Sequence, residues 1–257
     1  MGSRITTMSM LDKLFGGKKP EPRKGEAPAP APSAPIADGP LAAFALGANV
    51  EEIYCIFGEQ IQTGLGGLPH QLFAIAQRKL TSVDATLSAF GVDAPVRQAL
   101  STVKGRLERQ DASAAPEAAI AASQEFASQI SAQMGAIRRQ IGDIRGTQYD
   151  AGIFCARLAL CARIIRASFT SGGEMGAKMR EIYSKEIVRA GQTLRDTLVR
   201  SAQSGWLEKA FEPEWINALL EIARPAADGR GATADGARAI ETKIEGLLAQ
   251  AGFKQAG

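Results

Sequence analysis

The chain has 257 residues, a formal net charge of +3 and 45% apolar residues, while aromatic residues make up only 6%. A composition rich in alanine and poor in aromatic residues favours helices over sheets. The small net charge argues against a protein whose whole surface binds nucleic acid, and the length allows one large helical domain or two small ones.

Residues 1–17 contain a short amphipathic peptide. In a helix its apolar residues share one face, and two lysines follow a pair of glycines; this group is Met10, Leu11, Leu14, Phe15, Lys18 and Lys19. One or two isolated helical turns are unstable in water, so the peptide needs a membrane surface or a groove in a partner protein. The alternative is an unstructured start with four apolar residues together by chance.

Residues 18–40 hold seven of the twelve prolines, interleaved with alanine. Such repeats form an extended, semi-stiff spacer without a core of its own. We therefore expect a disordered linker that tethers the first peptide to a folded body. The alternative is a proline-rich ligand, for which Pro32 and Pro35 supply the required spacing.

Three helices are expected between residues 41 and 116. Asn49 and Glu52 have the spacing of an N-terminal capping pair for the first helix. The second runs over about 69–90, and Asp93 caps the third. His70 is the only histidine and lies in the first turn of the second helix, where a structural or exposed role is expected because one histidine cannot build a multi-histidine metal site.

Apolar residues recur at a 3.5-residue spacing from 117 to 169, which predicts the seam of a long packed helix. Gly142, Gly146 and Gly152 lie in its middle, and glycine weakens a helix. A turn near 146–150 is one interpretation; the unbroken spacing favours one long, bent helix. Residues 151–169 are apolar nearly all round and should form the most buried helix.

Three arginines, Arg157, Arg163 and Arg166, are the main polar side chains of this apolar stretch. Each would cost about 2.5–3.5 kcal/mol at the centre of a bilayer, which argues against a membrane span. Their guanidinium groups either find carboxylates at the rim of the bundle or form an anion pocket. Together with Arg189 on the next helix, they are candidate contacts for an anion or a partner.

Gly172 and Gly173 end the apolar helix, and a further helix is expected from Glu174 to about Arg200, with Met175 and Ile182 among its inward residues. Pro213 starts a short helix that Pro225 ends. Trp206 and Trp215 either cover the end of the bundle or form an exposed aromatic anchor. After a loose linker at 226–236, Asp235 caps a last amphipathic helix that packs back or engages another chain.

The three cysteines, Cys55, Cys155 and Cys161, have no metal-ligand spacing, and we expect reduced, buried thiols in a cytoplasmic protein. No reaction motif is present in the sequence, and neither a cofactor, a metal nor a small-molecule substrate is inferred. An enzyme with a site assembled in the bundle, from residues such as Glu51, Glu52, Glu59 or His70, remains an alternative.

We thus predict an all-α protein. Its antiparallel helical bundle, residues 41–225, is built around a long central helix or helix pair; residues 1–40 form the peptide and the disordered proline-rich tail, and 226–257 a linker and C-terminal helix. The predicted function is a non-enzymatic scaffold or adaptor, tethered at its N-terminus to a membrane surface, such as the inner face of the membrane, or to a partner protein, with self-association as a further outcome. The alternative is nucleic-acid or polyanion binding through residues 138–200, whose net charge is +6.

Overall fold

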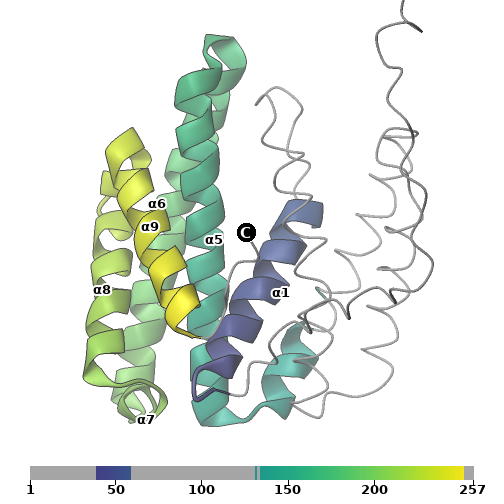
Figure 1. Cartoon of the computed structure of the whole chain (residues 1–257), viewed down its shortest axis with the longest axis vertical. Coiled ribbons are helices and arrows are strands. Elements are labelled where there is room, and N and C mark those ends of the chain that lie inside the picture. The colour runs from purple at the N-terminus through teal and green to yellow at the C-terminus, as the bar shows by residue number, and fades with distance from the viewer. Residues whose placement is uncertain (1–38, 59–130, 132–133, 252–257) are drawn as a thin grey trace, which may run out of the picture. The chain divides into compact units, whose positions relative to one another are not determined.

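The computed structural model describes residues 39–58, 131 and 134–251, which all lie in one unit spanning Ala34–Gly257. The predicted N-terminal tail through residue 38, the predicted second and third helices and residues 117–130 fall outside this part. The described residues form helices and no strand, so the all-α prediction is confirmed for them (Figure 1). The elements are α1 (Ala42–Gly58), α5 (Asp143–Ser171), α6 (Gly173–Gln203), α7 (Leu207–Ala210), α8 (Pro213–Ala227), the 3-10 turn η2 (Arg230–Ala232) and α9 (Ala234–Gln250).

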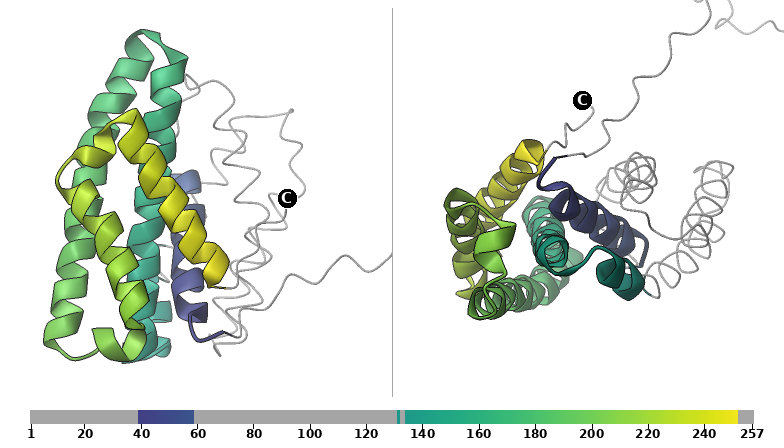
Figure 2. Two further views of the ribbon diagram at one scale, coloured as in Figure 1. Left: turned by 60° about the vertical axis from the view of Figure 1, so that its left-hand side comes forward. Right: turned by 90° about the horizontal axis from the view of Figure 1, so that it is seen from below.

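Helix α5 is the central element, as its apolar sequence predicts. It packs against α1, α6 and α9, while α8 packs against α6 (Figures 1 and 2). Its fully buried Leu158 and Ile165 meet Leu194 of α6, Ile222 of α8 and Ile244 of α9 in one core. Burial of side chains this large stabilises a fold by about 1.5–3 kcal/mol each. Within the described residues, no helix has both the length and the apolar character that a membrane crossing requires.

Two glycines allow α1 and α5 to pack with their backbones nearly in contact. A Cβ atom at Gly152 would lie 2.0 Å from the carbonyl oxygen of Phe44, and one at Gly47 would lie 2.2 Å from that of Tyr149. Because both neighbours are backbone atoms, neither can move aside as a flexible side chain does. This contact extends α1 back to Ala42, so Asn49 is a buried residue inside the helix and not its N-cap.

The expected long, bent helix is interrupted at Ile141 and Gly142. Residues 134–140 are helical, Gly142 has a left-handed φ of 73°, and α5 begins at Asp143. The turn therefore precedes the expected 146–150 region. Gly146 lies inside α5 for another reason: a Cβ atom there would lie 1.8 Å from Nη1 of Arg138. The glycine leaves room for a side chain and does not break the helix.

Helices α5 and α6 form a hairpin whose connecting end extends beyond α8 and α9 (Figures 1 and 2). Gly172 and Gly173 make the turn with φ values of 61° and 67°, as expected for residues that end a helix in the left-handed region. Met175 and Ile182 were expected to point inward, but both are exposed. The expected inward face was too wide: Met175 and Ile182 lie about 100° or more round α6 from the buried Ile187 and Leu194.

Two expectations for the C-terminal part are wrong in detail. Pro225 lies inside α8, which continues to Ala227 because Ala226 is buried close to Gly191 of α6. The N-cap of α9 is Thr233 and not Asp235, since the Thr233 hydroxyl accepts a hydrogen bond of 3.1 Å from the backbone N–H of Gly236. Helix α9 then packs along α5.

Candidate functional site

Several residues that the sequence singled out lie outside the described part of the chain. They include the candidate membrane or partner peptide with Met10, Leu11, Leu14, Phe15, Lys18 and Lys19, together with Glu59 and His70. Their predicted roles stay predictions.

The three arginines of α5 form ion pairs with glutamates of α1 and α9. Arg163 contacts Glu52 of α1, and its guanidinium also lies 2.9 Å from Glu241 and 3.4 Å from Glu245 of α9. The other two pairs join Arg157 to Glu51 and Arg166 to Glu241. These carboxylates come from helices far away along the chain, so the pairs hold α1 and α9 on the central helix.

The sequence allowed two interpretations of these arginines, pairing with carboxylates or an anion pocket. In the structure they pair with carboxylates. Arg163 and Glu241 are largely buried, and a buried charge needs a partner because burial alone penalises the charged form strongly. Arg189 is not part of this group; it lies on the exposed side of α6. Much of the basic excess of residues 138–200 is thus matched by acidic residues from elsewhere.

A second polar group is buried where α1 meets α5. Glu51 is fully buried, and its Oε2 has no hydrogen-bond partner; neither has the hydroxyl of Tyr149 nor Oδ1 of Asn49 among the described residues. Burial, reinforced by the negative charges of Glu51 and Asp150, raises the pKa of Tyr149 far above its ordinary value. Burial also raises the pKa of Cys155 to about 12, in agreement with an inert thiol.

The two tryptophans lie in different surroundings. Trp215 packs against Phe44 of α1 and Phe211, with ring centroids 5.3 Å and 6.2 Å away, and joins the edge of the core. Trp206 is half-buried and lies between α6 and α7, with Lys209 Nζ 4.7 Å from its ring centre. Trp206 also borders a pocket.

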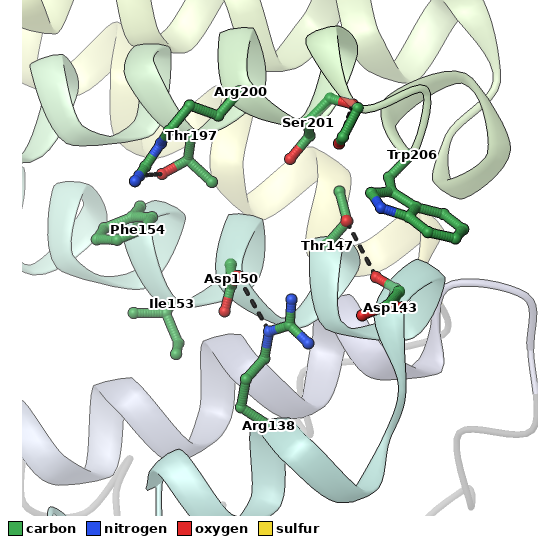
Figure 3. A pocket seen from close by; sticks show the side chains of 11 residues that line it. Arg138, Asp143, Thr147, Asp150, Ile153, Phe154, Thr197, Arg200, Ser201 and Trp206 are labelled. Atoms are coloured by element: carbon green, nitrogen blue, oxygen red, sulfur yellow. Dashed lines mark hydrogen bonds and ion pairs between the residues drawn. The ribbon is translucent and has the colours of Figure 1, made fainter.

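This pocket has a volume of about 440 Å³ and lies between α5, α6 and the turn that follows α6 (Figure 3). Arg138 reaches into it from the segment before α5 and donates a 3.1 Å hydrogen bond to Asp150. Burial raises the pKa of Asp150, while the positive charges of Arg138 and Arg200 act in the opposite direction. The pocket therefore holds a partly buried carboxylate near two guanidinium groups.

This pocket was not predicted from the sequence, although a signal was present. Asp143, Thr147, Asp150 and Phe154 recur at intervals of three or four residues and line it from one side of α5. The opposite wall, from α6, could not be paired with them by spacing alone. Among the described residues, no group of three His, Cys, Asp or Glu side chains is arranged to hold a metal.

The free end of the α5–α6 hairpin carries a further candidate surface. Three large apolar side chains are exposed there, Phe169 by 47%, Ile182 by 42% and Met175 by 37%. The hairpin is closely packed at this level, since a Cβ atom on Gly176 would lie 2.7 Å from the carbonyl oxygen of Ser168. The exposed side chains thus project from a well-defined helical end.

The described part defines an all-α protein with a central helix, a projecting helical hairpin and a polar pocket. Comparison with known proteins adds no relative, since no family model, no curated protein and no solved structure matches the chain.

Proposed function

We propose that the protein is a non-enzymatic helical scaffold or adaptor, and that the free end of its α5–α6 hairpin binds an amphipathic helix of a partner protein. The single observation that carries this proposal is the exposure of three large apolar side chains on the two helices of the hairpin, Phe169, Met175 and Ile182. Exposed apolar patches commonly mark sites of protein interaction, and Met175 and Ile182 lie on one face of α6.

The outward face of α6 supports this choice of partner. Met175 and Ile182 lie on one face of the helix, about 120° round it from the buried residues Ile187 and Leu194. A partner helix on this face would cover apolar side chains that the described helices leave exposed. Lys178, Glu181 and Lys185 are exposed on the same stretch of α6, so charges of both signs surround the apolar residues. A partner helix with an apolar stripe and mixed charges is complementary to such a surface.

The rigidity of the hairpin favours binding. Arg180 donates a hydrogen bond to the carbonyl oxygen of Ser168, and its guanidinium carbon lies 5.0 Å from the ring centre of Phe169. These contacts hold the two helices in register at their exposed end. A surface that is already ordered loses less conformational entropy when it binds.

The N-terminal peptide and its proline-rich spacer complete the proposed adaptor. Residues 1–17 would attach the protein to a membrane surface or to a second partner, and residues 18–40 would set the reach of the tether. On this proposal the protein is cytoplasmic and held at the inner face of the membrane. Deletion of residues 1–17 tests the tether through flotation with liposomes and localisation in cells; unchanged behaviour in both assays contradicts it.

Site-specific photo-crosslinking in cells tests the hairpin surface. A photoreactive residue at Ile182 should give a discrete adduct with one partner protein, whereas the same residue at Ala239, exposed on α9, should not. The adduct should disappear when Phe169 and Met175 are both changed to serine. Equal labelling at positions 182 and 239 contradicts the proposal; an adduct between two copies of the chain identifies self-association instead.

Polyanion binding through residues 138–200 has less support. Six of the twelve basic side chains in this region form ion pairs with carboxylates: Arg138, Arg157, Arg163, Arg166, Lys185 and Arg195. Fewer charges are left to displace counterions from a nucleic acid, and that displacement is the main source of affinity for such ligands.

A further inference from the structure

The pocket between α5 and α6 has a distinctive distribution of charge. Two arginines and two aspartates line it, so its formal charge is zero. Arg138 and Asp150 pair with each other at 3.1 Å in its middle. Figure 3 shows Arg200 toward one end, and Asp143 with Trp206 toward the other. The pocket is thus polar along its length without an excess of either charge.

Neither charged group at the two ends forms a direct ion pair among the described residues, although the charge of Arg200 acts on Asp150 and favours its ionised form. Arg200 donates hydrogen bonds to the carbonyl oxygen of Asp196 and to Oγ1 of Thr197, at 3.3 Å and 3.2 Å, but pairs with no carboxylate there. Asp143 accepts a hydrogen bond from Thr147 only through its main-chain carbonyl, at 3.1 Å, which leaves its carboxylate available. A positive and a negative group are therefore available at opposite ends.

The middle of the pocket is already satisfied. Arg138 is held by Asp150 and also donates a 3.3 Å hydrogen bond to the carbonyl oxygen of Gly142. The absence of a Cβ atom at Gly146 leaves room for this guanidinium. A ligand with a single charge would meet one complementary end and gain nothing at the other. A ligand with a charge at each end would gain at both.

We propose that this pocket binds a small zwitterion that has a carboxylate at the Arg200 end and an amine at the Asp143 end. The volume of about 440 Å³ lies within the range of about 300–1,000 Å³ that is usual for small-molecule sites. Phe154 near Arg200 and Trp206 near Asp143 supply apolar surface at the two ends of the pocket. This inference goes beyond the proposed scaffold function and does not depend on it.

Titration of the full chain with a series of ω-amino acids tests the proposal. Glycine, β-alanine, γ-aminobutyrate and 5-aminovalerate carry the same two charges at increasing separation, while butyrate and butylammonium carry one each. Binding is followed by NMR shifts of the pocket residues and by the fluorescence of Trp206 in a Trp215→Phe background. At least one amino acid should bind saturably below about 10 mM, more tightly than either single-charge probe.

Three variants distinguish the proposed site from general binding. Arg200→Gln should weaken the binding of the best probe about 10- to 100-fold, because a charge-assisted hydrogen bond is lost, and Asp143→Asn should weaken it as well. Arg195→Gln is the matched control: Arg195 is exposed on the same helix and pairs with its neighbour Asp196. Absence of saturable binding by every amino acid overturns the proposal, as does equal loss in the Arg195 variant or tighter binding of butyrate alone.

Discussion

Tyr149 shows how a single buried polar atom affects the α1–α5 contact. Its side chain is 1% exposed, and its hydroxyl has no hydrogen-bond partner among the described residues. A buried polar group without a partner costs about 1–3 kcal/mol. We expect Tyr149→Phe to raise the free energy of unfolding by about 1 kcal/mol, measured by urea denaturation. A loss of stability would instead indicate that the hydroxyl is hydrogen-bonded, for example through a buried water to Glu51.

Cys155 predicts a dependence of stability on alkaline pH. Burial raises the pKa of its thiol in the folded protein from 9.0 to about 12. Between these values the unfolded chain loses the proton while the folded protein keeps it, so the free energy of unfolding falls as pH rises. The expected slope is about 1.4 kcal/mol per pH unit for this group. Urea unfolding from neutral pH to about pH 10 measures it, and Cys155→Ala should reduce the slope; an unchanged slope would assign it to other groups.

Glu241 provides a test of the ion pairs between α5 and α9. It accepts hydrogen bonds from both Arg163 and Arg166, and its side chain is only 9% exposed. Glu241→Gln leaves two guanidinium groups without their shared carboxylate, and we expect a loss of about 2 kcal/mol, discounted because Arg166 is partly exposed.

The control for Glu241 is an exposed pair that joins α8 and α9. Glu221 of α8 and Lys243 of α9 lie 2.6 Å apart, with side chains 65% and 46% exposed. Water and salt screen such a pair, so Glu221→Gln should have little effect on thermal unfolding. Equal destabilisation by the two changes would contradict the structural role assigned to Glu241.

At the scale of helices, the contact between α1 and α5 depends on the absence of side chains. Gly152→Ala would place a Cβ atom against the backbone of Phe44 and Ala48, and we expect a loss of about 3 kcal/mol or more. Gly246→Ala is the matched control, because a Cβ atom at this position of α9 meets nothing within 4 Å. There the higher helix propensity of alanine should stabilise the protein by about 1 kcal/mol. Chemical denaturation of both variants checks the opposite signs.

Local sequence patterns predicted which segments are helical better than they predicted where each helix ends and which of its residues are buried. The glycines at 172 and 173 and the proline at 213 identified the ends of α5, α6 and α8 correctly. Asn49 and Pro225 were assigned to helix ends but lie inside helices, since packing against α5 and α6 outweighs their local preferences. The apolar spacing also could not indicate which of the apolar residues of α6 face the core, and Ile182 lies on its outward side.

At the scale of the whole molecule, the ion-pair partners and the pocket depend on contacts between segments that are distant along the chain. The sequence alone could not predict these contacts. Arg163 pairs with Glu52 and Glu241, which lie 111 and 78 residues away along the chain. No local spacing relates these positions. The pocket has the same origin, because Asp143 and Arg200 come from two helices whose relative rotation is set by side-chain packing. Candidate residues could therefore be identified from the sequence, but their interaction partners could be identified only from the folded structure.

If the N-terminal segment acts only as a tether and the helices form the folded body, the effect of deleting residues 1–33 can be predicted. The described helices lie in the unit Ala34–Gly257, and the composition of residues 1–33 predicts a stretch without a core. A chain that lacks residues 1–33 should therefore unfold at the same temperature as the full chain, as measured by circular dichroism. It should still form the Ile182 photo-adduct when supplied with the purified partner, but should no longer reach the membrane. A lower unfolding temperature would mean that the N-terminal segment contributes to the folded body, and the tether model would then be wrong.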